Sequence, residues 1–466
     1  MKIKHIKALM VTVISLTIIL PSCKKNLQED PYSSLSADAV FTNEDGLKKA
    51  TLGIYQGFTS DAFTAWYRFG LSETGHQYAA QGIFGEAFWG DQNKFIGTSS
   101  SQVAGECNSI WSQDYNIIAR ANTVIDNASK AVTDAALASQ YIAEARFLRG
   151  FTYFDLVRHF GGVPLVDKQI TSLGQSDLLF GQRATIQQTY DFIVADLLAA
   201  IPNLPDKREG SDVGRVSAGA AKAMLGKVYL NMAGKPLNLT ANYQKAIEIL
   251  NQVVGPANES KYNFSLLPNF KDVFSFSNER NPEILLSFSW NYTTTSGGAI
   301  TPFFSLPRNF VSPDEQTFYG LTYQFYQLFE NKDTRRDQTV VTRYKSVSSG
   351  DGALVGDSII YNAGRMKYID TVTHTVFGNA TVNQGISYAK FDRSPRATGN
   401  PFSFSQDVVM LRFSDVLLCL AEAMIENGDP ASALPLINRV RARAGATPYV
   451  GLTAMRDREG WSAAWN

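Results

Sequence analysis

Cysteine and histidine are scarce in this chain, which has three cysteines and four histidines among 466 residues. Cys419 lies in an apolar run that is typical of a buried free thiol, so no disulfide framework with Cys107 is expected. The three histidines beyond the N-terminal segment are far apart and lack metal-ligand spacing, and no Gly-x-Ser-x-Gly nucleophile elbow occurs. The sequence therefore predicts no metal, no cofactor and no catalytic residue.

Long apolar runs and an excess of one charge are also missing. After the N-terminal segment no stretch stays apolar over the ~20 residues that a transmembrane helix needs. Basic and acidic residues both number 43, and they form no basic stripe. Nucleic acid is therefore not expected as a partner.

The N-terminal segment is the most informative part of the sequence. Three lysines without an acidic residue precede an apolar run from Ala8 to Leu20, which is too short to span a bilayer and has the build of a secretory signal. Small residues lead directly into Cys23, as in a lipoprotein signal whose cysteine is acylated and becomes the new N-terminus. The alternative is an ordinary cleaved signal with a chance cysteine. We predict a signal peptide over residues 1–22 and lipidation at Cys23.

Apolar residues then recur at three- and four-residue steps, which predicts a mainly α-helical body. Asn43 and Asp134 precede two of these patterns as N-caps, and Gly161-Gly162 ends one of them. The expected helices cover about 43–58, 111–125, 134–160, 186–200, 217–233, 243–254, 413–426 and 431–443.

Long stretches without helical periodicity separate these helices, at roughly 59–105, 258–330 and 340–406. Residues 282–290 and 385–391 read as short strands, but no sheet-forming series is expected. The long stretches are rich in aromatic residues, which argues against disorder, and loops this long inside a compact protein are usually functional.

Two neighbouring helix pairs have the spacing of tetratricopeptide repeats, in which a small residue allows close helix contact. Gly226-x-x-Tyr229 is followed by Ala246 and Leu250, and Leu417–Met424 by Ala433–Val440. Gly150-x-x-Tyr153 is a weaker third case. Any antiparallel helix pair could give one such match by chance, but together they favour a repeat-like helical scaffold.

Several segments together resemble one known family. They are Trp111–Asp126, Glu144–Leu165 with its Phe-Gly-Gly-Val-Pro, Leu411–Ala423 with its Leu-Arg-Phe-Ser-Asp, Ile437–Gly445 with its Arg-Ala-Gly, and the N-terminal Cys23. In these residues the chain resembles the RagB/SusD nutrient-uptake outer-membrane lipoproteins of Bacteroidetes.

The resemblance implies a SusD-like fold over residues 23–466, with tetratricopeptide-like helix pairs and long irregular loops. It also implies a lipid-anchored protein of the outer membrane that faces the cell exterior. Its partners would be a SusC-like TonB-dependent transporter, which docks on the helices, and a glycan ligand bound by the loops. One departure concerns the C-terminus, where the family's Glu- and Arg-rich closing segment is absent after Gly445, so we expect a truncated or frameshifted chain.

The loops contain the residue types of a sugar-binding surface, because aromatic rings stack on the C–H faces of sugars while amides and carboxylates bind hydroxyls. We predict ligand contacts from the following five aromatic residues, although burial in the core is an alternative for each: Trp66, Tyr78, Trp89, Trp290 and Tyr292. By contrast, Trp111 lies on an apolar helical stripe and is expected in the core. Arg146, Arg149 and Arg158 are expected in structural ion pairs, and His159 at a helix C-terminus.

The preferred interpretation is a non-catalytic protein that captures oligosaccharide at the cell surface and passes it to the transporter. One alternative is a surface-anchored glycan-degrading enzyme, which would need two carboxylates about 5–9 Å apart, a distance that sequence cannot establish. The other is a helical-repeat scaffold that binds only proteins.

Overall fold

The computed structural model describes the following residues: 37–59, 79–81, 101–172, 174–175, 177, 181–289, 319–321, 323–341, 343–347, 354–362, 365–369, 376–377, 387–388, 390 and 405–451.

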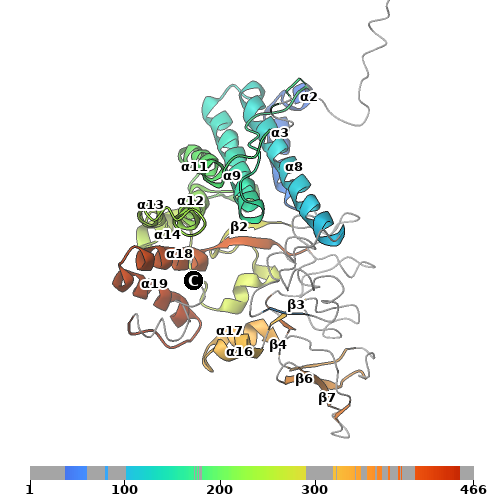
Figure 1. Ribbon diagram of the computed structural model, residues 1–466, viewed down its shortest axis with the longest axis vertical. Coiled ribbons are helices and arrows are strands. Elements are labelled where there is room, and N and C mark those ends of the chain that lie inside the picture. The colour runs from blue at the N-terminus through green and yellow to red at the C-terminus, as the bar shows by residue number, and fades with distance from the viewer. Residues whose placement is uncertain are drawn as a thin grey trace, which may run out of the picture.

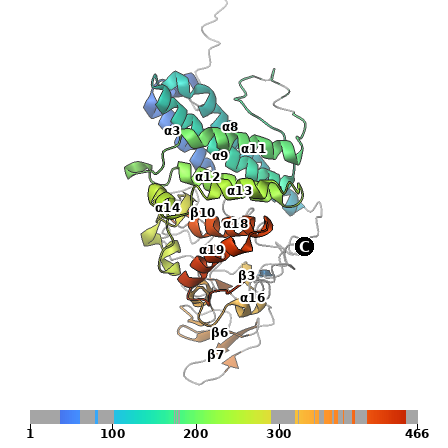
Figure 2. The same cartoon turned by 90° about the vertical axis from the view of Figure 1, so that its left-hand side faces the viewer.

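A stack of α-helices forms most of the described structure (Figure 1). Successive helices contact one another from α8 through α9, α11, α12, α13 and α18 to α19, and α3 packs on both α8 and α9. Figure 2 shows this order from top to bottom, with α16 and the strands β6 and β7 below α19. The helices are α2 (Ala37–Val40), α3 (Glu44–Gly57), α8 (Ser101–Ala131), α9 (Ala135–Phe160), α11 (Ile186–Ala200), α12 (Ala218–Ala233), α13 (Asn242–Leu250), α14 (Pro256–Tyr262), α16 (Tyr323–Leu328), α17 (Thr334–Thr339), α18 (Phe413–Glu426) and α19 (Pro430–Arg443). Short 3₁₀ turns are η2 (Ile201–Asn203), η3 (Gly210–Asp212), η4 (Phe270–Phe274) and η5 (Phe276–Asn278).

The predicted caps set the helix ends. The Asn43 side chain accepts a hydrogen bond from the backbone of Gly46, and Asp134 accepts from the backbones of Ala136 and Leu137, which satisfies amides that a helix N-terminus otherwise leaves free. Gly161 follows α9 with a φ of 70°, a backbone conformation that favours glycine. The predicted helix over 134–160 is therefore confirmed.

The two repeat-like helix pairs are also confirmed. A Cβ built on Gly226 of α12 would lie 2.3 Å from Leu250 Cδ2 of α13, so only glycine allows this approach. In the second pair Leu417 and Leu420 of α18 are buried, as is Val440 of α19. The weaker Gly150 position packs at ordinary contact distance, with its Cβ 3.5 Å from Asp196 Cβ.

Some helix boundaries differ from the prediction. Helix α8 begins at Ser101, inside a stretch that was expected to be irregular, and α13 ends at Leu250 instead of Val254. The short helices α14, α16 and α17 were not predicted, because six or seven residues are too few for a helical period to stand out.

A two-stranded ribbon of β2 (Ile284–Phe288) and β10 (Val408–Arg412) joins the middle of the chain to α18. The strands are antiparallel, with Val408 opposite Phe288, and the register shifts on either side of Leu411. Strand β2 lies inside the predicted strand 282–290, and its residues Leu285, Leu286 and Phe288 are buried.

The expectation that no series of strands forms a sheet is wrong. Strands β5 (Arg343–Lys345), β6 (Ser358–Asn362), β7 (Arg365–Ile369) and β8 (Val376–Phe377) form a four-stranded antiparallel sheet in chain order. Two further pairs join β1 (Ala79–Gln81) to β3 (Tyr319–Leu321) and β4 (Val340–Val341) to β9 (Ser387–Tyr388). These strands are only two to five residues long, which is too short for an alternating apolar pattern to stand out in the sequence.

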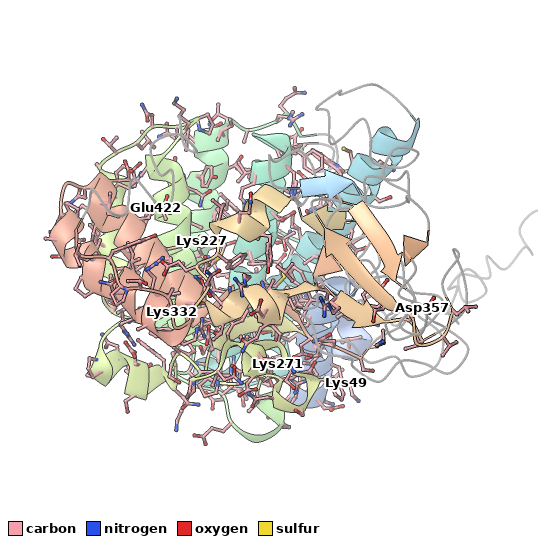
Figure 3. All side chains as sticks on the ribbon, turned by 90° about the horizontal axis from the view of Figure 1, so that it is seen from below. Lys49, Lys227, Lys271, Lys332, Asp357 and Glu422 are labelled. Carbon is pink, nitrogen blue, oxygen red and sulfur yellow. The ribbon has the colours of Figure 1, made fainter. Side chains whose placement is uncertain are left out.

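The core lies between the helices and along β2, and it includes the predicted buried thiol of Cys419. An ion pair between Lys227 Nζ and Asp415 Oδ2, at 2.7 Å, ties α12 to α18. Figure 3 shows Lys227 and Glu422 on the helical side of the molecule, whereas Asp357 lies beside the small sheet on the opposite side.

Candidate functional site

The predicted ligand-contacting residues lie outside the described part of the chain, as does the predicted lipidation site. They are Cys23, Trp66, Tyr78, Trp89, Trp290 and Tyr292. The described residues that flank them nevertheless show where these chain segments are attached to the scaffold.

Residues 60–78 and 290–318, which we call the aromatic segments, continue from two adjacent points of the helical scaffold. Phe58 caps the end of α3, and Phe288 is the last residue of β2. Their rings stack with centroids 4.2 Å apart and planes 2° from parallel, and Phe151 of α9 packs edge-on against both, at 5.7 and 5.9 Å. Contacts between aromatic rings of this kind add to the stability gained from burial alone. The three rings therefore fix the starting points of residues 60–78 and 290–318 side by side.

The same two segments also end at one place. Strand β1 follows residues 60–78 and β3 follows residues 290–318, and the two strands pair antiparallel with Ala79 opposite Leu321 and Gln81 opposite Tyr319. Four of the five predicted contact residues belong to these two segments, which begin together and end together. Trp89 lies in the chain between β1 and α8.

A cavity of about 300 Å³ lies beside the common starting point, and we call it the loop-base cavity. Its lining includes Tyr55, Thr59, Arg215, Phe288 and Ser289. This volume is at the lower end of the roughly 300–1,000 Å³ typical of small-ligand sites. Ser289 immediately precedes Trp290, so the cavity borders the start of the second aromatic segment.

A buried ionic network supports this cavity. The carboxylate of Glu144, on α9, is 0 % exposed. It accepts hydrogen bonds from the Tyr55 hydroxyl at 2.6 Å, from Arg215 Nε at 2.8 Å and from Arg208 Nη2 at 3.0 Å. The Tyr55 hydroxyl in turn accepts from the backbone N–H of Val216 at 2.9 Å. Burial, together with the charge of Glu144, raises the pKa of Tyr55 well above its usual value, so this hydroxyl stays protonated and acts as a donor.

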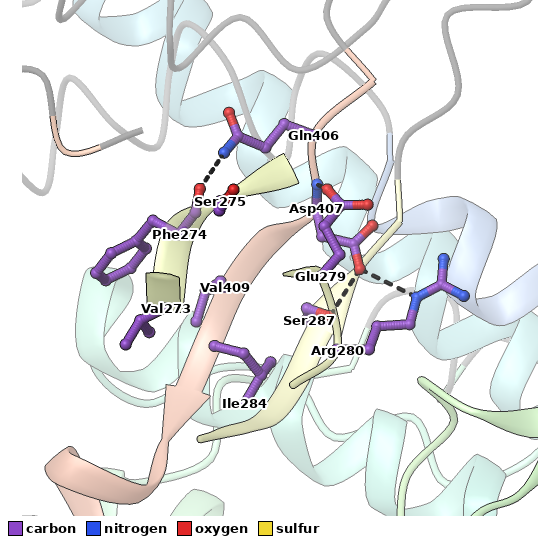
Figure 4. A pocket seen from close by; sticks show the side chains of 10 residues that line it. All are labelled: Val273, Phe274, Ser275, Glu279, Arg280, Ile284, Ser287, Gln406, Asp407 and Val409. Atoms are coloured by element: carbon purple, nitrogen blue, oxygen red, sulfur yellow. Dashed lines mark hydrogen bonds and ion pairs between the residues drawn. The ribbon is translucent and has the colours of Figure 1, made fainter. Parts of the chain in front are cut away.

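Arg280 lies on the wall of the same cavity. Its Nε donates to Asp407 Oδ2 at 3.3 Å, and its Nη2 donates to Ser289 Oγ at 2.9 Å. Ser287 Oγ donates to the same Asp407 oxygen at 3.1 Å (Figure 4). Arg280 thus connects the N-terminal end of β10 with the residue that precedes the second aromatic segment.

The carboxyl of Glu279 lies next to this group. Burial, with a further contribution from the charge of Asp407, raises the pKa of Glu279 from 4.5 to about 7. The backbone N–H of Asp407 donates to Glu279 Oε1 at 2.6 Å. The protonation state of Glu279 therefore changes near neutral pH, next to the start of β10.

The predicted structural role of the family-like arginines is confirmed for α9. Arg149 binds Asp196 of α11 through Nε and Nη2, both at 2.7 Å, and its Nη1 donates to Asn122 of α8 at 2.6 Å. Arg146 is paired with the same aspartate at 3.5 Å. These side chains hold three helices together and do not line the loop-base cavity.

The end of α9 also agrees with the sequence analysis. Arg158 pairs with Asp155 at 3.2 Å, and His159 lies in the last helical turn with Nδ1 3.1 Å from Asp155 Oδ2. Trp111 packs against the core and against the rings of Tyr115 and Phe160.

Within the residues that the structure describes, no group of three or more His, Cys, Asp or Glu side chains is placed to hold a metal ion. No helix among those residues is both long and apolar enough to cross a membrane.

Comparison with known families gives two adjoining matches. A family model described as "Starch-binding associating with outer membrane" matches residues 25–230, and the SusD family model matches residues 226–457. The SusD-like protein P2 of Formosa agariphila is 26 % identical over an alignment of 451 residues that covers 93 % of this chain and 81 % of that protein.

Solved structures share the fold. A SusD homolog from Bacteroides thetaiotaomicron superposes with a TM-score of 0.72 at 23 % identity, covering 91 % of this chain and 83 % of that one. A laminarin-binding SusD-like protein superposes with a TM-score of 0.70 at 26 % identity, covering 90 % and 88 % of the two chains.

Proposed function

This chain belongs to the SusD/RagB family, and from that premise we propose that it captures oligosaccharide at the cell surface without catalysis and passes it to a SusC-like TonB-dependent outer-membrane transporter. The observation that carries the proposal is the pair of adjoining family matches, which together extend over residues 25–457. The first matching family is described as associating with the outer membrane, and one similar structure is of a laminarin-binding protein.

The geometry supports a ligand site on the aromatic segments. Residues 60–78 and 290–318 follow the stacked Phe58 and Phe288 and lead into the paired strands β1 and β3, so the described residues that flank them lie together at both ends. Rigid helices hold these attachment points, which suits a binding site whose loops vary with the ligand. We assign the glycan to this region, with contacts from Trp66, Tyr78, Trp89, Trp290 and Tyr292.

The remaining parts of the proposal concern the membrane. Acylation at Cys23 would anchor the protein in the outer membrane, facing the cell exterior, because a multiply acylated cysteine supplies enough buried hydrocarbon for stable attachment. The helical stack offers a broad rigid surface for the transporter, as repeat scaffolds commonly do. Mass spectrometry of the mature N-terminus tests the anchor, and co-purification with a SusC-like transporter tests the partner.

The binding proposal is tested with the protein purified without its first 23 residues. A panel of immobilised glycans that includes laminarin should retain it, and calorimetry should then give a saturable affinity. Trp89→Ala, Trp290→Ala and Tyr292→Ala should each weaken binding by at least about 1 kcal/mol if the rings stack on sugar. Tyr243→Ala, on α13, which contributes no residue to the lining of the loop-base cavity, is the matched control and should leave affinity unchanged.

Two outcomes would contradict the proposal. If no aromatic variant weakens binding, the site assignment is wrong. If the purified protein releases shorter sugars from the bound glycan, it is an enzyme and the transport role loses its basis.

A further inference from the structure

A second cavity lies against the loop-base cavity, and it was not anticipated from the sequence. It has a volume of about 320 Å³ and lies toward α14; we call it the helix-side cavity. The two cavities share Val213, Gly214, Arg215, Arg280 and Ser287 in their linings. They are therefore neighbouring chambers with a common wall, and one of them borders the start of the second aromatic segment.

The helix-side cavity has the chemistry of a sugar-binding chamber. The rings of Tyr262 and Phe264, whose centroids are 5.9 Å apart, form an apolar part of its lining. Ser217, Ser260 and Asn263 supply hydroxyl and amide groups around them. A concave lining in which polar groups surround some aromatic surface can bind a small polar ligand.

Arg280, at the wall between the two cavities, has a strained backbone. Arg280 has a φ of 57°, which is unfavourable for a residue with a large side chain, and Gly214 has a φ of 101°. A Cβ on Gly214 would be only 3.4 Å from Arg280 Cδ, so the two residues are closely packed. Asn263, which ends α14 in the left-handed conformation common for asparagine at a helix end, lines the helix-side cavity as well. The conformation of Arg280 persists only where the surrounding structure enforces it, and strained residues of this kind cluster at ligand sites.

The guanidinium of Arg280 remains available to a ligand. Its side chain is 41 % exposed, and the described residues engage its Nε and Nη2. A guanidinium carries five N–H donors and no acceptor, so further donors can reach an oxygen in the cavity. Both cavities and the small pocket drawn in Figure 4 are lined by Arg280.

The charges around the two cavities are balanced. Arg208 and Arg215 share the carboxylate of Glu144, and Arg215 is also paired with Asp212 at 3.0 Å. Arg280 is paired with Asp407. The remaining cation of the lining, Lys207, is paired with Glu209 at 2.8 Å. Because each cationic side chain already has an acidic partner, a ligand that carries its own negative charge gains little. The lining favours a neutral ligand with many hydroxyl groups.

We propose that the two cavities form a saccharide subsite for one neutral hexose unit, separate from the aromatic segments, with Arg280 donating hydrogen bonds to its oxygens. The assignment rests on the proposed glycan capture and extends it, since the loop-base cavity adjoins Ser289 and can receive a branch or an end of a bound chain. The subsite selects neutral hexoses over uronic acids.

The test uses saturation-transfer NMR on the whole mature chain. The probes are glucose, galactose and mannose as neutral hexoses, and glucuronate and galacturonate as their acidic counterparts. Neutral hexoses should receive saturation from the protein, and the signal should persist in Trp290→Ala because the subsite does not need that ring. Transfer only to the uronates, or to no sugar at all, would overturn the proposal.

Two variants locate the subsite. Ser260→Trp places a large side chain in the helix-side cavity and should abolish transfer, whereas Ala257→Trp lies on an exposed position of the same short helix that does not line the cavity. Arg280→Asn keeps a residue that tolerates the left-handed backbone and removes the guanidinium, so it should weaken the hexose affinity about three- to tenfold. Arg280→Lys should give partial recovery. Equal binding by Ser260→Trp and Ala257→Trp, or unchanged affinity in Arg280→Asn, would refute the assignment.

These outcomes separate the two proposals. Suppose that glycans bind and that the aromatic variants bind them more weakly, but that Ser260→Trp does not change the hexose signal. The subsite assignment is then wrong and the proposed function stands. If hexoses bind in the cavity but no glycan is retained by the panel, the proposed function fails and the subsite stands.

Discussion

The buried network around Glu144 makes the sharpest prediction about stability. Glu144→Ala removes a fully buried carboxylate that accepts hydrogen bonds from Arg208, Arg215 and Tyr55. Arg215 keeps a weaker partner, since its Nη1 is 3.0 Å from Asp212 Oδ1, whereas the substitution takes away the carboxylate that Arg208 is paired with. Removing one member of a buried ion pair costs about 3–5 kcal/mol, mostly because the remaining charge stays desolvated.

The stability loss of a smaller substitution in the same network can be compared with that of Glu144→Ala. Tyr55→Phe leaves both arginines on Glu144 but removes the hydroxyl that donates to the carboxylate and accepts from the Val216 N–H. An unsatisfied buried backbone N–H costs about 1–3 kcal/mol, so the loss should be clear but smaller than that of Glu144→Ala.

The measurement is urea unfolding at neutral pH, followed by the far-UV circular dichroism of the helices. Glu209→Gln is the matched control, because its ion pair with Lys207 has a similar length, 2.8 Å, but both side chains are exposed. Water and salt screen such a pair, so this variant should show no measurable change. If Glu144→Ala loses no more stability than Tyr55→Phe, or if Glu209→Gln loses as much, then burial is not what makes this network strong.

Two further predictions concern a helix contact and pH. Gly226→Ala should lower the free energy of unfolding by about 1–3 kcal/mol, because the added Cβ would lie 2.3 Å from Leu250. Gly53→Ala in α3, where nothing lies within 4 Å of the added Cβ, should raise the free energy of unfolding by about 0.5–1 kcal/mol. Equal effects of the two substitutions in urea unfolding would contradict the packing argument. Burial raises the pKa of both Glu279 and Glu422 from 4.5 to about 7, so the folded state holds protons that the unfolded state has released, and stability should fall as pH rises through this range. Changing both to glutamine should flatten that fall, and an unaltered slope would show that these groups do not cause it.

The helical scaffold could be predicted from the sequence because its determinants are local. A cap such as Asp134, an apolar period and a terminating Gly161-Gly162 all lie within one helix. Even the contact at Gly226 involves a partner, Leu250, that is only one helix away. Such features leave a regular pattern in the sequence, and the structure confirms the helices where that pattern is strong.

The cavities could not be predicted because their walls join residues that are far apart in sequence. Glu144 meets Tyr55 across 89 residues and Arg215 across 71, and Arg280 meets Asp407 across 127. The stretch from Asn278 to Asn281 reads as an ordinary polar turn. Only the left-handed backbone of Arg280, which the sequence does not reveal, marks it as unusual.

This difference between scaffold and site has a physical consequence for how the site can change. Phe58, Phe288 and Phe151 lock the ends of α3 and β2, and the Glu144 network lies directly beneath them, so the attachment points are held by the core. Substitutions within residues 60–78 or 290–318 leave those contacts intact. A change at the attachment points therefore acts on the stability of the core and, under the proposed glycan site, on binding as well. A loss of glycan affinity in Phe288→Ala would accordingly be accompanied by a lower unfolding midpoint, but the loss in Trp290→Ala, two positions further along the chain, would not.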